Sequence, residues 1–291
     1  MAHNNWGYEL AEQGKVDEAK AHYLAALDVY PSFPEAHFNL GDLFSAEGRT
    51  EEALAQYRAA VEAKPDFAEA HNNLSNLLAK RGDGQQALKY ATEAIRLRPN
   101  YPQAHFNCGN ALSLLGKVAE AAVEYSTAVR LKPDYAEAHL DLANALTEMP
   151  GRLAEAIAHY EEALRLKPDL AEAHNSLATS LAKIPGRSTE AIAHFREALR
   201  LKPDFAVAFD TRSSVCFVMG DLAGALKDHN EAIRLKPDYG EAFYNRSFTR
   251  KALGDKEGAQ SDYDEAIRLG FKPKLNHKPL DCMYKLSLLG G

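Results

Sequence analysis

Histidine returns at nearly regular intervals along this chain, and imidazole is a common metal ligand and general base in proteins. Ligand nitrogens must approach one zinc ion to about 2 Å, whereas equivalent residues on stacked helices lie roughly 10 Å apart. The column therefore predicts no metal site. We interpret the rings as filling an aromatic position, because Phe209 and Phe243 replace them later in the chain. The six histidines are His3, His37, His71, His105, His139 and His174.

Asparagine forms a second column that suits the binding of a peptide. A carboxamide offers both a donor and an acceptor, which match the backbone groups of an extended chain. Units about 10 Å apart would meet such a chain at about every third residue, since it advances 3.3–3.6 Å per residue. The predicted groove residues are Asn39, Asn73, Asn76, Asn107, Asn110, Asn144 and Asn245, with the aromatic anchors Phe38, Phe106 and Tyr244. Two alternatives stay open: the asparagines as a plain feature of the repeat, and the aromatic rings as packing between neighbouring helices.

Motifs for catalysis are not found in the sequence. There is no phosphate loop, no His-Glu-x-x-His, no Gly-x-Ser-x-Gly and no pair of catalytic carboxylates that stands out from the repeated background. The recurring glutamates, such as Glu69, are explained as helix-capping partners. We therefore predict no catalytic residue, no metal, no cofactor and no enzymatic activity.

These columns recur because the whole segment recurs about every 34 residues. Counting Ala68 as position one, Gly or another small residue occupies position eight, Ala occupies positions twenty and twenty-seven, and Pro occupies position thirty-two. Such a period predicts a hairpin of two helices per copy. The predicted copies span residues 1–33, 34–67, 68–101, 102–135, 136–170, 171–205, 206–239 and 240–273, and residues 274–291 form a cap or tail.

Capping residues, glycine and proline set the ends of the predicted helices. Asp-x-x-Glu pairs, such as Asp66 with Glu69, are expected to cap the first helix of a copy. Glycine at position fifteen, as in Gly82, ends that helix, and a Lys-Pro-Asp run ends the second. The fifth and sixth copies carry one extra residue, which predicts a longer turn, and the seventh and eighth copies place Arg212 and Arg246 where the others mostly carry Leu.

This pattern resembles the tetratricopeptide repeat (TPR), in its period, in the placement of Gly, Ala and Pro, and in its aromatic positions. The resemblance covers roughly residues 1–273. It implies an all-α, right-handed TPR superhelix (α-solenoid) of eight helical hairpins, with a C-terminal capping helix that Leu280, Met283 and Tyr284 would help to form; a disordered tail is the alternative. Helix positions two, five, six, nine and twelve would line the concave groove.

The resemblance implies a noncatalytic scaffold for protein interactions that binds an extended peptide or partner segment. The asparagine column is also similar to that in the TPR region of O-linked N-acetylglucosamine transferases. The alternative function is therefore the substrate-recruiting TPR portion of a larger enzyme, such as a protein glycosyltransferase. Trp6 stands where other copies carry Leu, so either it caps the first repeat or the chain begins partway through a longer array.

Charge and composition narrow the partners. Basic pairs such as Arg96 with Arg98 end the second helices, where cations complement the helix dipole. The formal net charge of −7 argues against nucleic acid, and the chain has no long apolar run for membrane insertion. Three scattered cysteines indicate neither a disulfide framework nor a zinc cluster. We expect a cytoplasmic protein with a protein or peptide partner, and self-association stays open.

Overall fold

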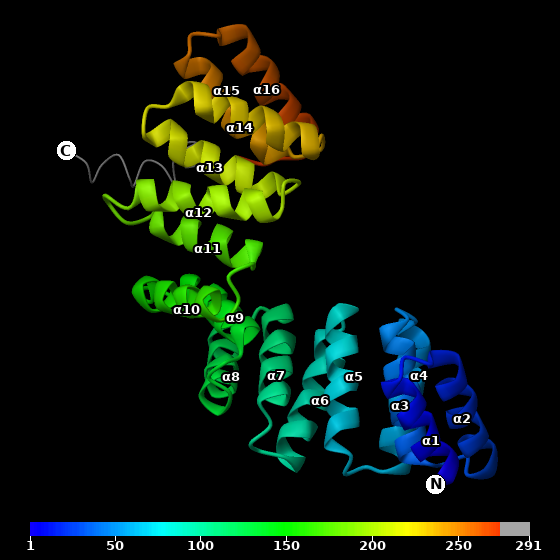
Figure 1. Ribbon diagram of the computed structural model, residues 1–291. Coiled ribbons are helices and arrows are strands. Elements are labelled where there is room, and N and C mark those ends of the chain that lie inside the picture. Colours follow the sequence, from blue (N-terminus) through cyan, green and yellow to red (C-terminus); the bar gives the residue numbers. More distant parts are fainter. Residues whose placement is uncertain (274–291) are drawn as a thin grey trace. The chain divides into compact units, whose positions relative to one another are not determined.

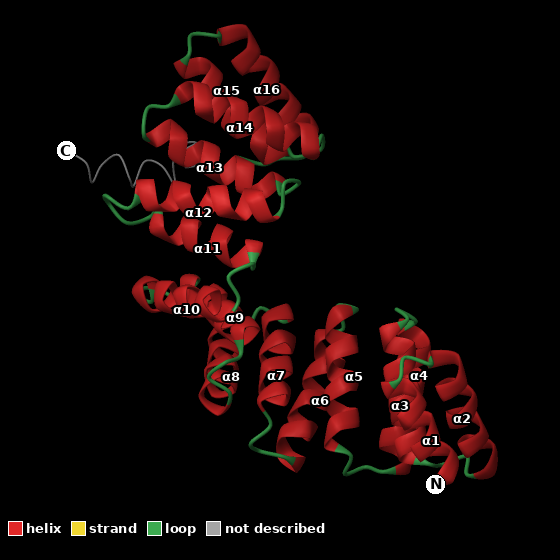
Figure 2. Cartoon of the chain, viewed as in Figure 1, coloured by secondary structure: helices red, strands yellow, loops and turns green. Residues whose placement is uncertain are grey.

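The computed structural model describes residues 1–273 of the chain, and these residues form helices joined by short turns, with no strand among them (Figure 1, Figure 2). The prediction of an all-helical repeat protein is thus confirmed. The predicted cap or tail at 274–291, and Cys282 with it, lies outside the described residues. The helices are α1 (Ala2–Glu12), α2 (Val16–Val29), α3 (Pro34–Ala46), α4 (Thr50–Ala63), α5 (Ala68–Lys80), α6 (Gly84–Leu97), α7 (Pro102–Leu114), α8 (Val118–Leu131), α9 (Ala136–Thr147), α10 (Leu153–Leu166), α11 (Ala171–Leu181), α12 (Ser188–Leu201), α13 (Ala206–Val218), α14 (Leu222–Leu235), α15 (Gly240–Ala252) and α16 (Lys256–Arg268).

Two compact units make up the chain. Unit 1 runs from Met1 to Glu148 and holds α1–α9, and unit 2 begins at Met149 and holds α10–α16. The boundary falls in the turn between α9 and α10, inside the copy predicted at 136–170. In unit 1, α3 packs on α4, α5 on α6 and α7 on α8, and α5 also contacts α7 directly. The first helices α5 and α7 of two successive hairpins therefore lie side by side, as do α1 and α3.

Glycine ends the first helix of each hairpin, as the sequence predicts. Gly82 has φ +86° and Gly151 has φ +79°, a left-handed conformation that costs glycine little and other residues more. The extra residue of the fifth and sixth copies is absorbed in this turn, since α9 and α11 are shorter than the other first helices after α1, while α10 and α12 keep 14 residues each.

The predicted Asp-x-x-Glu caps are wrong. In α5 the N-cap residue is Phe67, and neither there nor at α9, α11 and α15 does a side chain cap the helix. Glu69 instead pairs with Arg98, so the glutamate ties its helix to the turn that ends the same hairpin. Aspartate caps occur at the start of second helices, where Asp83 accepts from the backbone N–H of Gln86 at 3.2 Å.

Close approach of paired helices depends on small residues. Ala87 and Ala94 are fully buried, as positions twenty and twenty-seven predict. At position eight, Gly109 lies against the ring of Tyr125 so closely that a Cβ atom there would be 2.5 Å from Tyr125 Cε1. The missing side chain lets the tyrosine cross from α8 to α7, where its hydroxyl donates to Asn110 Oδ1 at 2.8 Å.

We expect Gly109→Ala to lower the free energy of unfolding by about 1–3 kcal/mol, because the added methyl overpacks against the tyrosine ring. Urea denaturation followed by circular dichroism measures the loss. Combining it with Tyr125→Ala should cost less than the sum of the two single changes, since the ring that clashes is gone. Additive losses would show that the two residues are not in contact.

Candidate functional site

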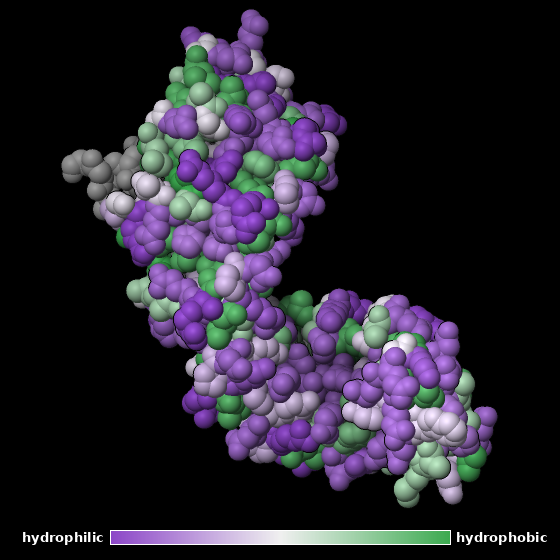
Figure 3. All heavy atoms as spheres, in the orientation of Figure 1, coloured by the Kyte–Doolittle hydropathy of each residue, from purple (hydrophilic) through white to green (hydrophobic). Residues whose placement is uncertain are grey.

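A pocket of about 830 Å³ lies on the first helices of unit 1. It contains four of the predicted groove residues, Asn76, Phe106, Asn107 and Asn110. We call it the Phe106 pocket. The face of unit 1 drawn in Figure 3 is hollowed, with mainly hydrophilic residues in the hollow. The other residues that line the pocket are Asn72, Ala79, Lys80, Gln103, Ser113, Leu114, Tyr125, Tyr135, Glu137 and Asp141.

A second pocket, of about 480 Å³, lies on α1 and α3. It contains two further predicted residues, Phe38 and Asn39, and we call it the Phe38 pocket. Its other lining residues are Asn4, Asn5, Tyr8, Glu9, Glu35 and Phe67. Position five of the repeat supplies the phenylalanine in both pockets.

The asparagines of position six are used largely inside the protein. Asn107, which is 5% exposed, donates to the side-chain oxygen of Asn72 at 2.8 Å and to its carbonyl at 3.3 Å. Asn39 likewise donates to Asn4 Oδ1 at 3.1 Å. These bonds join the first helices of successive hairpins. The sequence did not reveal this second use, although the spacing of 35 residues between the partners repeats in both pairs.

Asn73 takes part in a related contact between α5 and α3. Its amide donates to Asp42 Oδ1 at 3.0 Å, and the Tyr57 hydroxyl donates to the same oxygen at 2.6 Å. Burial raises the pKa of the Asp42 carboxyl, and these two hydrogen bonds oppose the increase. Asn73 therefore braces two hairpins in the structure.

The asparagines of position nine are arranged differently. Asn110 lines the pocket and accepts from Tyr125 through Oδ1, so this bond uses the amide oxygen and not the N–H groups. Asn76 lines the same pocket and is only partly buried. Asn144, on α9, donates to Asp141 Oδ1 at 3.4 Å. Position nine thus supplies the better-placed donors for a ligand in the Phe106 pocket.

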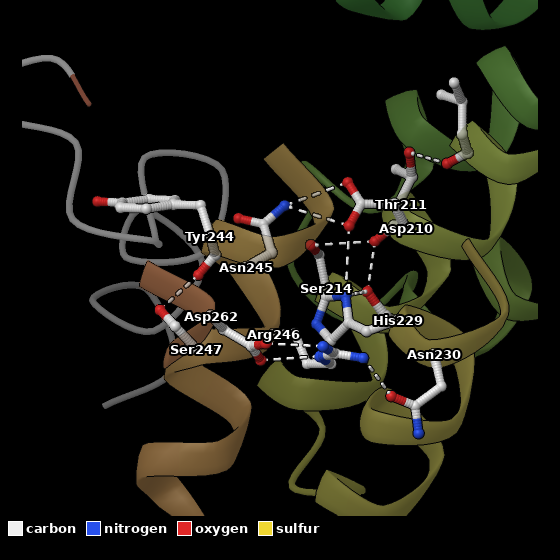
Figure 4. Close-up of polar contacts among 12 residues, drawn as sticks. Asp210, Thr211, Ser214, His229, Asn230, Tyr244, Asn245, Arg246, Ser247 and Asp262 are labelled. Carbon is white, nitrogen blue, oxygen red and sulfur yellow. Dashed lines mark hydrogen bonds and ion pairs between the residues drawn. The ribbon is translucent and has the colours of Figure 1, made fainter. Parts of the chain in front are cut away.

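Asn245 and Tyr244 belong to unit 2 and are described apart from these pockets. Asn245 donates to both carboxylate oxygens of Asp210, at 3.3 and 3.1 Å (Figure 4). Tyr244 is 4% exposed, and its ring lies 4.8 Å from that of Phe271. This burial leaves the Tyr244 ring little surface for contact with a partner.

Charge in the two pockets is mainly negative. Glu9 and Glu35 line the Phe38 pocket, Glu137 and Asp141 line the Phe106 pocket, and Lys80 is the one cation among the described residues that line either. Burial raises the pKa of the Asp141 carboxyl from 3.8 to about 6; a hydrogen bond from Asn144 opposes the increase and the Glu137 charge adds to it.

The histidine column has a structural role that the sequence interpretation missed. The Nε2–H group of His71 donates to the Pro65 carbonyl at 2.9 Å, and His105 makes the same bond to Pro99 at 2.9 Å. Each ring thereby ties its helix to the proline turn that precedes it. In residues 1–273 there is no group of three or more His, Cys, Asp or Glu side chains that could hold a metal ion.

One buried cluster in unit 2 contains the residue types of a catalytic triad. Ser213 Oγ and Asp210 Oδ1 lie 2.9 and 3.2 Å from His229, but both contact its Nδ1 nitrogen. A triad needs the serine on one ring nitrogen and the carboxylate on the other, and Ser213 and His229 are also fully buried. Burial raises the pKa of the Cys108 thiol to about 12, which disfavours its nucleophilic thiolate form.

Arg212 and Arg246, which replace leucine in the last two copies, form ion pairs within their hairpins. Arg246 donates to both oxygens of Asp262 on the facing helix, at 2.8 and 2.6 Å (Figure 4), and Arg212 makes the equivalent pair with Asp228. Both aspartates are almost fully buried. These arginines therefore hold the hairpins together instead of presenting charge to a ligand.

The basic residues at the ends of the second helices are also paired. Arg96 contacts Glu93 at 2.6 Å, and Arg200 contacts Glu197 at 2.6 Å, each three residues earlier on the same helix. Lys202 reaches Glu172 at 2.9 Å and lies over the ring of Phe205. The stripe of basic residues seen in the sequence thus has structural partners.

Comparison with known proteins identifies the class. Two family models described as tetratricopeptide repeat and TPR repeat match residues 4–68 and 43–105, and residues 109–149 and 151–184, respectively. The chain belongs to the tetratricopeptide-repeat family, whose members generally serve as scaffolds for protein interactions. A search of curated proteins found no match.

Two solved structures share the fold. One is YrrB, described as a TPR protein with an unusual peptide-binding site: the TM-score is 0.53 and the identity 22%, over 64% of this chain and 95% of that one. The other is MamA, with a TM-score of 0.50 and an identity of 21%, over 56% of this chain and 94% of that one. Among residues 1–273, no helix combines the length and apolar character needed to cross a membrane.

We expect Asp141→Asn to stabilise unit 1 at neutral pH. Between about pH 4 and 6 the folded carboxyl binds a proton that the unfolded one has lost, so the free energy of unfolding falls as pH rises through this window. Asparagine removes the cost of burying the ionised Asp141 carboxylate, and it occupies the same position in most other copies. The expected gain above pH 6 is on the order of 1 kcal/mol, because partial exposure screens the charge, and it should disappear near pH 4.

Thermal unfolding of the parent and of Asp141→Asn at pH 4, 5, 6, 7 and 8 measures this difference. The exposed Asp134→Asn is the control and should leave the pH profile unchanged. Parallel profiles for parent and Asp141→Asn would contradict the assignment.

The two classes of asparagine should separate in stability measurements. Asn107→Ala leaves the buried Asn72 side chain without its donor, so a loss of about 1–3 kcal/mol in the free energy of unfolding is expected. Asn76→Ala removes no described contact between hairpins and should change stability by less than about 0.5 kcal/mol. Urea denaturation of both variants tests the division, and equal losses would refute it.

Proposed function

We propose that this chain is a noncatalytic scaffold that binds an extended segment of a partner protein along the first helices of unit 1. The observation that carries the proposal is the Phe106 pocket, where carboxamides and an aromatic ring lie side by side. Carboxamides suit peptide backbone groups. An apolar ring surrounded by polar groups suits a side chain of the same peptide.

The donors of this pocket are fixed before a ligand arrives. Tyr125 holds Asn110 by its oxygen at 2.8 Å, so the amide N–H groups need no reorientation to meet a peptide carbonyl. Asn107, which is 5% exposed, is held by Asn72 through its own N–H groups and so fixes the helices that carry the pocket. Preorganised groups lose less entropy on binding, and each hydrogen bond then contributes more to affinity.

Family and neighbours support the same reading. Members of the family generally bind proteins, and the description of YrrB names a peptide-binding site in a chain with this fold. Its identity to the present chain is 22%, so it supports the kind of ligand and not the residues that bind it.

The double variant Asn76→Ala with Asn110→Ala tests the proposal. Peptides are first selected from a random display library on the parent protein, and their Kd values are then measured by fluorescence anisotropy. Each neutral hydrogen bond is worth about 0.5–1.5 kcal/mol, so losing two should weaken binding roughly tenfold.

The control variant carries Gln85→Ala and Asn100→Ala, which remove two exposed amides outside both pockets. It should bind like the parent. Selected peptides that bind the pocket variant as tightly as the parent would place the binding surface elsewhere.

A further inference from the structure

Position five of the repeat alternates between asparagine and phenylalanine in the first four hairpins, and the fifth copy carries Leu140 there. Asn4, Phe38, Asn72 and Phe106 occupy it in successive hairpins, on α1, α3, α5 and α7. The surface that lines the two pockets thus repeats every two hairpins and not every one. Figure 1 shows α5 between α3 and α7.

The two phenylalanines have the same surroundings. The ring of Phe38 lies 5.8 Å from that of Tyr57 at 49°, and the ring of Phe106 lies 5.8 Å from that of Tyr125 at 49°. A second aromatic ring completes each cluster, at 4.9 Å from Phe38 and 5.0 Å from Phe106. These second rings are Phe67 and Tyr135.

The hairpin between them is built differently. Its position five is Asn72, which accepts from Asn107, and position twenty-four, where the crossing tyrosine stands in the neighbouring copies, is Ala91. Asn4 takes the corresponding place beside the Phe38 pocket, where it accepts from Asn39. Each pocket therefore has an aromatic side and an amide side, in the same order along the chain.

We propose that unit 1 binds one extended segment of a partner protein at two equivalent pockets. The segment carries two apolar side chains six residues apart, and a lysine or arginine lies near each of them. This inference rests on the proposed function, since it specifies the peptide that the same surface recognises. The Phe38 pocket takes one apolar side chain and the Phe106 pocket takes the other.

Geometry sets the spacing. Packed helices of successive hairpins lie up to about 10 Å apart, so two hairpins correspond to about 20 Å. An extended chain covers this distance in about six residues at 3.3–3.6 Å each. Side chains of an extended peptide alternate between its two faces, and residues separated by an even number share a face. A separation of six satisfies both conditions, and a separation of five does not.

Charge sets the second requirement. Glu9 and Glu35 line one pocket and Asp141 lines the other, and Lys80 is the one cation among the described lining residues; Lys64 lies 3.6 Å from Glu35 in an exposed pair. Glu9 is exposed. A basic residue next to each apolar side chain would meet negative charge at both points, whereas an acidic one would be repelled.

A set of labelled peptides tests the spacing directly. Each has fourteen residues of serine and glycine, with two leucines separated by three, four, five, six or eight positions and an arginine two positions after each leucine. A peptide with one leucine and one arginine gives the affinity of a single pocket. Fluorescence anisotropy on the full chain measures the affinities. The peptide whose leucines are six positions apart should bind at least about tenfold more tightly than the single-leucine peptide and than the peptide whose leucines are five positions apart.

Substitutions in each pocket test whether both pockets bind the peptide. Phe38→Ala and Phe106→Ala should each lower the affinity for the peptide whose leucines are six positions apart to that of the single-leucine peptide. Phe205→Ala, an aromatic change in unit 2, should not lower it. Because loss of a phenylalanine also removes packing, Glu9→Gln with Glu35→Gln provides a second test that keeps the rings. It should lower the preference for arginine over glutamine in the peptide several-fold without removing the preference for a separation of six.

The outcomes distinguish this inference from the proposed function. Equal affinity at every separation, together with weaker binding by the Asn76→Ala and Asn110→Ala variant, would overturn the two-point reading and keep the groove. Binding that neither the asparagine nor the phenylalanine changes affect would overturn both.

Discussion

The close approach of a tyrosine ring to a glycine is the constraint on which three hairpins of unit 1 depend. Gly109 and Tyr125, like Gly41 and Tyr57, leave no room for a Cβ atom between the two helices of a hairpin. The ring fills the interior, and its hydroxyl emerges on the first helix beside the pocket residues. One contact thus sets both the distance between helices and the orientation of Asn110 or Asp42.

Much of the fold follows from the sequence because its signals are local. A glycine at position fifteen needs no knowledge of neighbours to predict a turn, and buried alanines such as Ala87 follow from their period. The predicted aspartate caps are wrong because capping depends on structure outside the local segment. Whether Asp66 reaches a backbone N–H depends on the shape of the preceding proline turn, and whether Glu69 helps depends on Arg98, which lies 29 residues further along the chain.

The candidate site likewise combines local features that the sequence predicts with features that depend on packing. The sequence predicts which helix positions carry amides, and three of the predicted asparagines meet in the Phe106 pocket. It could not predict that position six donates to the preceding hairpin while position nine does not, because this depends on the packing of one repeat on the next. The pKa of Asp141 is likewise a property of burial, which a single sequence does not state.

The arginine–aspartate pairs of unit 2 determine the size of the piece in which these repeats can be exchanged. In four of the eight copies leucine occupies position seven, at Leu40, Leu74, Leu142 and Leu177, and each of these side chains is buried. Arg246 requires Asp262, and Arg212 requires Asp228, on the second helix of the same hairpin. A buried charge without its partner is strongly destabilising. Recombination within the last two copies must therefore move whole hairpins to keep each charge paired, whereas in copies such as 102–135 the match between Gly109 and Tyr125 sets the same limit through packing.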